Sequence, residues 1–218
     1  EFRTALALRP DPDGHNHIGA LLQRLGRYQE AAFEFQKAIS LAPDYVVAYM
    51  NLGETFLQAK QPQEAILWFE KSTRIKPDLQ DAYLKLCDVY LDLNRPADAI
   101  LILKKGLQRT RGLFSIALRL AWLLAIDPDA KLRDGSQAML LAKKACEKTD
   151  YSNPAALDVL AAAYAETGKF DQATKLARKA SRLASQSERF ANLAPGIQRR
   201  IALYVKNRPY RRQANQLD

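Results

Sequence analysis

Few residues of this chain have the types and the spacing that catalysis or metal binding requires. The two histidines, His15 and His17, have no carboxylate or cysteine partners at ligand spacing, which makes a poor metal site. The two cysteines, Cys87 and Cys146, lack metal-ligand spacing and lie far along the chain from both histidines, so no Cys/His or Ser/His/Asp set is visible. We therefore predict that the chain is not an enzyme, with no catalytic residue, no metal and no cofactor, and that the cysteines are packing residues.

Three acidic residues lie close together in one segment, at Asp127, Asp129 and Asp134. Carboxylates can bind a cation, but aspartate is also a common residue of loops and helix N-caps. We interpret these residues as loop and helix-cap residues, with a cation site as the less favoured alternative. The glycines fall at turns and close contacts and form no phosphate-binding loop.

The elements that hold these residues repeat along the chain with a period of 34. Ala31, Ala65 and Ala99 are spaced by 34 residues, and so are Pro43 and Pro77, each of which is followed by aspartate. Within each period, apolar residues recur at helical spacing. A period of this length is typical of stacked helical repeats, in which one repeat alone cannot bury its apolar face.

On these residues the chain resembles the tetratricopeptide-repeat (TPR) family, whose unit is a helix–turn–helix of 34 residues. The first full repeat carries the pattern as Ile18, Gly19, Leu22, Gly26, Tyr28, Ala31, Phe35, Ala38 and Pro43. The second repeat carries it as Tyr49, Leu52, Gly53, Phe56, Ala65, Phe69 and Pro77, and the third keeps Tyr83, Leu86, Tyr90 and Ala99. The third departs from the pattern at Cys87, Leu103 and Arg111. The pentatricopeptide family, which binds RNA and has a period of 35, is the less favoured alternative.

The resemblance implies an all-α fold, a right-handed superhelical solenoid of antiparallel helix pairs with a C-terminal capping helix. Gly19, Gly53 and Cys87 are expected where paired helices approach closely, and Gly26, Asn94 and Gly168 where helices end. The predicted parts are the second helix of a truncated repeat at 1–11, repeats at 12–45, 46–79, 80–113, 114–152 and 153–186, and a capping helix with a basic tail at 187–218.

The fourth repeat is irregular and the cap is polar. We predict helices over 114–126 and 136–148, joined by a loop longer than the family loop, and one capping helix over 187–207, bent at Pro195 and Gly196. The irregular repeat resembles C-terminal TPR segments of bacterial proteins. This resemblance implies a bacterial source and a C-terminal piece of a longer protein, and it leaves the compartment open between the cytoplasm and the periplasm.

The formal net charge of +9 is concentrated at the C-terminal end. From Arg189 onwards, one acid accompanies seven basic residues, which are Arg189, Arg199, Arg200, Lys206, Arg208, Arg211 and Arg212. The rest of the chain is nearly balanced, so the basic composition is weak evidence for nucleic acid. No apolar run is long enough to span a membrane.

In TPR arrays the first helix of each pair lines the concave surface, where partners bind. The resemblance therefore implies a groove with an apolar floor and acidic edges, suited to a peptide or helix that has apolar and basic residues. Its predicted partner-binding residues are Met50, Glu54, Leu57, Leu84, Asp88, Leu91 and Trp122. The alternative is that Leu84, Leu91 and Leu118 are core residues of adjacent helices. A carboxylate clamp is not predicted, because its positions hold Asn16, Ala20, Asn51, Asp81 and Lys85, of which Asn51 alone matches.

Three functions compete on this evidence. The favoured one is a protein–protein interaction scaffold. The second is self-assembly into a homo-oligomer or filament, because the array opens in mid-repeat and the basic tail complements the acidic groove. Its predicted contact residues are Phe2, Arg199, Arg200, Lys206 and Arg208. The least favoured is nucleic-acid binding through the basic tail, with Tyr204 and Tyr210 available to stack on bases.

Overall fold

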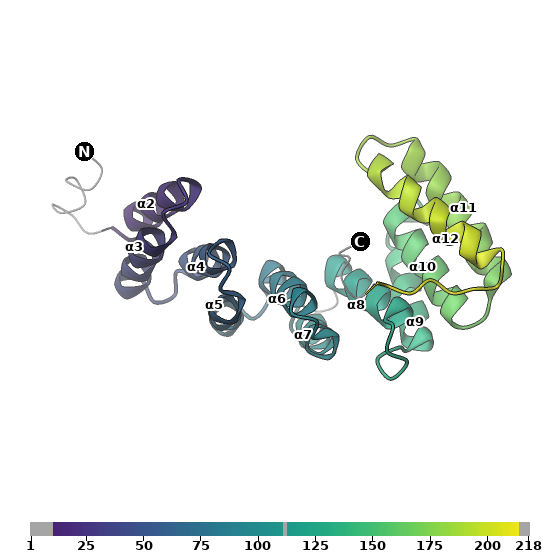
Figure 1. Cartoon of the computed structure of the whole chain (residues 1–218), viewed down its shortest axis with the longest axis horizontal. Helices are drawn as coiled ribbons and strands as arrows, with labels where there is room; N and C mark the ends of the chain where they lie inside the picture. The colour runs from purple at the N-terminus through teal and green to yellow at the C-terminus, as the bar shows by residue number, and fades with distance from the viewer. Residues whose placement is uncertain (1–10, 111–112, 214–218) are drawn as a thin grey trace. The chain divides into compact units, whose positions relative to one another are not determined.

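The computed structural model describes residues 11–110 and 113–213, and the regular secondary structure of these residues is entirely helical (Figure 1). They form eleven α helices and one short 3-10 helix, without a β strand among them. The all-α prediction is therefore confirmed. The helices belong to two compact units, the first ending at Leu93 and the second beginning at Asn94. Phe2 lies outside the described residues.

The described residues of the first unit form five helices, and each packs against the next along the chain. Their bounds are α2 Pro12–Arg24, α3 Tyr28–Leu41, α4 Val46–Gln58, α5 Pro62–Ile75 and α6 Gln80–Asp92. The turn from α2 to α3 passes through Gly26 at a φ of 74°, which glycine adopts without strain. The carboxylate of Asp11 caps α2 by accepting from the backbone N–H groups of Asp13 and Gly14.

Small residues let the two helices of a repeat touch, as the sequence predicts. A Cβ atom added at Gly19 would lie 2.7 Å from the ring of Phe35, and one added at Gly53 would lie 2.6 Å from the ring of Phe69. Both rings are fully buried. The same glycine–phenylalanine contact is thus made twice, one repeat apart, and it fixes how closely the first helix approaches the second.

We expect Gly53→Ala to lower the free energy of unfolding of the first unit by about 1–3 kcal/mol, because the buried ring of Phe69 cannot move aside without straining the core. Urea titration read at Trp68 in α5 measures this loss. Gly53→Ala combined with Phe69→Leu should cost less than the sum of the two single changes. A strictly additive cost would show that the two side chains do not compete for the same space.

Proline carbonyls between repeats accept a repeated hydrogen bond. The hydroxyl of Tyr49 donates to the carbonyl of Pro43 at 2.9 Å, and the hydroxyl of Tyr83 donates to the carbonyl of Pro77 at the same distance. Each bond satisfies a carbonyl that has no partner inside a helix. The shared 34-residue spacing of prolines and tyrosines therefore has a structural cause.

The second unit contains the remaining helices. Their bounds are α7 Pro96–Arg109, α8 Phe114–Ile126, α9 Gly135–Glu147, α10 Pro154–Glu166, α11 Phe170–Ser185, the 3-10 helix η1 Ala191–Leu193 and α12 Ala194–Tyr204. From α7 to α12 each α helix packs on the next one, and α8 also packs on α10. The first helices of the fourth and fifth repeats therefore lie side by side. Asn94 (φ 54°) and Gly168 (φ 76°) adopt the left-handed conformation expected at helix ends.

The acidic loop before α9 is organised by its own aspartates. Asp134 caps α9 by accepting from the backbone N–H of Gln137, and Asp127 accepts from the N–H of Asp129. Asp129 accepts in turn from the N–H of Lys131. The interpretation as loop and cap residues is confirmed. No cluster that could hold a metal ion occurs among the residues the structure describes.

The capping helix is shorter than the sequence predicts. The predicted range is 187–207 with a bend at Pro195, but α12 begins only at Ala194, after η1. Proline suits the first turn of a helix, where its missing N–H would have no partner, so Pro195 marks a start and not a bend. One face of α12 buries Ile197 and Tyr204.

Both cysteines are packing residues, as predicted. Cys87 and Cys146 are fully buried, and neither is in a disulfide. Burial raises the pKa of the Cys146 thiol to about 11, which suppresses its thiolate form at neutral pH. In the described part of the chain, no helix is long and apolar enough to cross a membrane.

Candidate functional site

The first helices of the first unit are joined on one face by polar pairs. Asn51 of α4 donates from Nδ2 to Oδ1 of Asn16 of α2 at 2.8 Å. The ammonium of Lys85 on α6 pairs with the carboxylate of Glu54 on α4. These pairs place α2, α4 and α6 beside one another, which is the arrangement that a first-helix face requires.

The same pairs involve three of the positions at which a carboxylate clamp would lie. Asn16, Asn51 and Lys85 occupy clamp positions, but each of them contacts a neighbouring helix. Asn51 and Lys85 each use one donor in these contacts, and the carboxamide oxygen of Asn16 is the acceptor. The first-helix face therefore offers apolar side chains and acids in place of clamp donors.

The predicted apolar floor of the first unit is partly accessible. Met50, Leu57 and Leu84 are half-buried, whereas Leu91 is only 5% exposed and belongs to the core. Val47 on the same helix as Met50 is 46% exposed. Leu91 is therefore a core residue, as the alternative interpretation has it. Met50, Leu57 and Leu84 keep exposed surface that a partner could cover.

Acidic residues border this floor. Asp81 and Asp92 at the two ends of α6 are exposed, and Asp88 between them is half-buried. Glu54 is half-buried and paired with Lys85. We name the surface formed by Met50, Glu54, Leu57, Leu84 and Asp88 the α4/α6 face.

In the second unit, a segment that follows α12 lies against Trp122. After α12 the chain runs back past α10 to α8 (Figure 1), and we name residues 208–213 the C-terminal strap. The ring of Tyr210 in the strap stacks on Trp122 with centroids 6.0 Å apart and an interplanar angle of 27°. The guanidinium of Arg200 lies 5.0 Å from the Trp122 ring centre and 5.5 Å from that of Tyr210. Trp122, one of the predicted partner-binding residues, thus contacts side chains of its own chain.

A buried ion pair fixes this cluster to α10. Arg200 donates from Nε and Nη2 to the two carboxylate oxygens of Asp158, at 3.0 and 2.6 Å. Burial by itself would lower the pKa of Arg200, but the adjacent Asp158 carboxylate outweighs burial and raises it. The fully buried Tyr204 lies nearby, and burial raises the pKa of its hydroxyl well above the usual value.

The strap is anchored by its two last arginines. The backbone N–H of Arg212 donates to the carbonyl of Ile126 at 2.9 Å, and its Nη2 donates to Asp127 at 3.3 Å. Arg211 Nη2 lies 2.5 Å from Glu166 Oε2, an ion pair that is close but poorly aligned as a hydrogen bond. Glu166 also accepts from Arg133 Nε at 2.8 Å. We name the surface formed by Trp122, Asp127, Asp158 and Glu166 the α8/α10 groove.

These contacts divide the basic tail into two groups. Arg200, Arg211 and Arg212 are paired with acids, whereas the predicted contact residues Arg199, Lys206 and Arg208 are exposed. Three of the seven basic residues of the tail are therefore neutralised by acids of the fold and are not available to bind nucleic acid. The sequence analysis did not single out Asp158 and Glu166, which pair with two of these arginines, although their acidity on first helices is the signal that would have indicated them.

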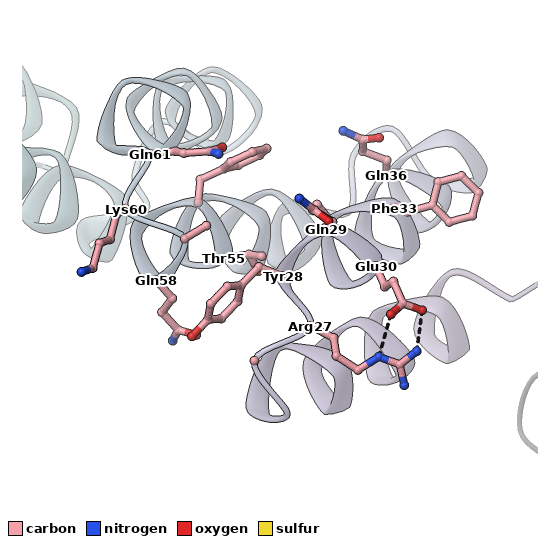
Figure 2. A pocket seen from close by; sticks show the side chains of 14 residues that line it. Arg27, Tyr28, Gln29, Glu30, Phe33, Gln36, Thr55, Gln58, Lys60 and Gln61 are labelled. Carbon is pink, nitrogen blue, oxygen red and sulfur yellow. Dashed lines mark hydrogen bonds and ion pairs between the residues drawn. The ribbon is translucent and has the colours of Figure 1, made fainter.

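Two recesses lie away from the first-helix faces. In the first unit, a cleft of about 840 Å³ is lined by the α2–α3 turn, α3 and the junction of α4 with α5. Figure 2 shows Arg27 and Glu30 facing each other there, joined by two hydrogen bonds. In the second unit, a recess of about 770 Å³ lies between α11 and the end of α12. Its lining includes four basic residues, Lys175, Arg178, Lys179 and Arg182. None of the four forms an ion pair with a described residue.

Comparison with known families identifies the class of protein. Models described as tetratricopeptide repeat match residues 13–78, 56–123 and 155–186. These segments together cover more than half of the chain, which therefore belongs to the tetratricopeptide-repeat family. Proteins of this family are in general scaffolds for protein–protein interaction. Compared with curated protein sequences, the chain shows no significant match.

Solved structures support the same fold. The MamA protein is 18% identical, with a TM-score of 0.62 over 82% of this chain and 94% of that one. YrrB, described as a TPR protein with an unusual peptide-binding site, is 19% identical, with a TM-score of 0.62 over 89% of this chain and 97% of that one. TTC0263, described as a thermophilic TPR protein in Thermus thermophilus, is 21% identical, with a TM-score of 0.54 over 89% of this chain and 99% of that one.

Proposed function

We propose that this chain is a non-catalytic scaffold that binds a polypeptide partner on its first-helix faces. The observation that carries the proposal is the C-terminal strap, an extended segment lying on the α8/α10 groove. It is held by ring stacking, one backbone hydrogen bond and ion pairs. These are the contacts by which grooves of repeat proteins hold extended peptides.

The α4/α6 face supports the same function in the first unit. Its half-buried Met50, Leu57 and Leu84 would supply apolar contact, and the exposed Asp81 and Asp92 would attract basic residues of a partner. The chemistry resembles that of the α8/α10 groove, where acids pair with arginines. The fit is to a helix or extended peptide with apolar residues flanked by lysine or arginine.

Selection of binding peptides tests this proposal. Short peptides from a random displayed library would be selected on the full chain and then titrated against variants. We expect Met50→Lys and Leu84→Lys to weaken binding at least about tenfold, because each buries a charge at the contact and repels a basic partner. The matched controls are Leu67→Lys and Leu101→Lys, at exposed leucines on α5 and α7. If the control variants lost as much affinity as Met50→Lys and Leu84→Lys, the peptide would not bind specifically at the α4/α6 face.

Self-assembly remains a second candidate because one observation favours it. The strap follows α12 through residues 205–207, with Asn207 at a φ of 53°, and a segment joined by so short a turn could dock on a second copy. Light scattering over a range of protein concentrations and salt would detect it. Mass that rises with concentration and falls with salt would support exchange of straps, and a constant monomer mass would contradict it.

A further inference from the structure

We propose that the α8/α10 groove recognises a partner segment in which an aromatic residue is followed by two arginines, and that the C-terminal strap is a resident ligand that competes with it. This inference rests on the proposed scaffold function and adds the chemistry of the partner. It also assigns the strap a role in controlling access to the groove.

The groove is built for this chemistry from two kinds of subsite. Trp122 and the guanidinium of Arg200 form a slot for one aromatic ring, and Asp158 keeps Arg200 in place. Beyond the slot, Glu166 and Asp127 pair with two successive arginines, Arg211 and Arg212. The spacing of slot and acids matches an extended segment, in which consecutive side chains point in different directions.

A backbone contact beside the aromatic slot indicates that the ligand is extended. The carbonyl of Ile126, at the end of α8, accepts from the backbone N–H of Arg212. A helical segment would use that N–H within its own backbone. The groove therefore combines side-chain recognition with a backbone contact available only to an extended chain.

The strap fits its groove incompletely. Residues 208–213 form no regular secondary structure, and Arg212 makes the one backbone–backbone hydrogen bond between the described strap and α8. The side chain of Arg211 is 32% exposed. Nε of Arg212 is buried without a hydrogen-bond partner among the described residues, which costs free energy. A segment held in this way can leave the groove without unfolding the helices.

Tethering explains why the strap nevertheless fills the groove. A segment attached through a short turn has an effective concentration in the millimolar range, so an untethered peptide of equal intrinsic affinity competes poorly. The apparent affinity for a partner is reduced by the fraction of molecules in which the strap is bound. Weakening the strap must therefore tighten partner binding, whereas a purely structural strap would have no such effect.

The test uses the full chain labelled with 5-fluorotryptophan, because its two tryptophans, Trp68 and Trp122, give one signal in each unit. The probe is a synthetic peptide of residues 207–213, Asn-Arg-Pro-Tyr-Arg-Arg-Gln, which contains the strap sequence. We expect it to bind Tyr210→Ala at least about tenfold more tightly than the unmodified chain and to shift the Trp122 signal alone. A control peptide with alanine in place of tyrosine should not bind.

Equal affinity for the two chains, no binding to Tyr210→Ala, or a shift at Trp68 would each overturn the inference. If Tyr210→Ala does not fold, Arg211→Ala gives the same comparison, because it removes a partly exposed ion pair to Glu166 and the 3.4 Å hydrogen bond to the carbonyl of Ala125, and no buried ring. Failure of this inference can be distinguished from failure of the scaffold proposal. Selected peptides that depend on Met50 and Leu84 would uphold the scaffold even where the strap peptide fails to bind.

Discussion

Replacing Arg200 by alanine is expected to destabilise the second unit by about 3–5 kcal/mol. The change removes both hydrogen bonds to Asp158, which is only 7% exposed, and leaves a buried carboxylate without its counter-charge. It also removes the cation that lies over Trp122 and Tyr210. Urea titration read at the fluorine signal of Trp122 measures the loss in this unit.

Two comparisons separate this explanation from a general effect of losing charge. Arg199→Ala, at the exposed neighbouring position, should change the free energy of unfolding by no more than about 0.5 kcal/mol. Arg200→Met combined with Asp158→Leu should recover much of the loss, since it removes both buried charges. A loss below about 1 kcal/mol for Arg200→Ala would mean that the pair is solvated.

Phe69→Ala is expected to destabilise the first unit by about 3–5 kcal/mol. The ring is 0% exposed and fills the space that Gly53 leaves open, so truncation creates a cavity between paired helices. The fluorine signal of Trp68 reports the transition. Phe33→Ala is the matched control, because Phe33 is 56% exposed on α3, and its effect should be small. Similar losses for the two phenylalanines would contradict the burial argument.

The helix pairs could be predicted because their signals are local and periodic. Gly19 and Gly53 recur at the spacing at which Phe35 and Phe69 meet them. The prolines that precede Tyr49 and Tyr83 recur with the same period, because each tyrosine bonds to one of their carbonyls. A pattern repeated in this way identifies both the elements and their partners.

The docking of the strap could not be predicted in the same way. Arg200 and Asp158 are 42 residues apart, and Arg212 and Asp127 are 85 apart, and no period connects them. The sequence indicates only that a basic tail complements an acidic groove. Which arginines are buried depends on where α12 begins and ends, and the predicted start of that helix is too early.

The central claim, that first-helix faces bind polypeptide, is tested most directly by methyl NMR of the two methionines. Met50 lies on the α4/α6 face and Met139 on α9, the second helix of its pair. With methyl-labelled methionine and a peptide selected on the full chain, we predict that the Met50 signal shifts in proportion to binding while the Met139 signal stays in place. A shift confined to Met139, or saturation of binding with both the Met50 signal and the fluorine signal of Trp122 unmoved, would contradict the claim.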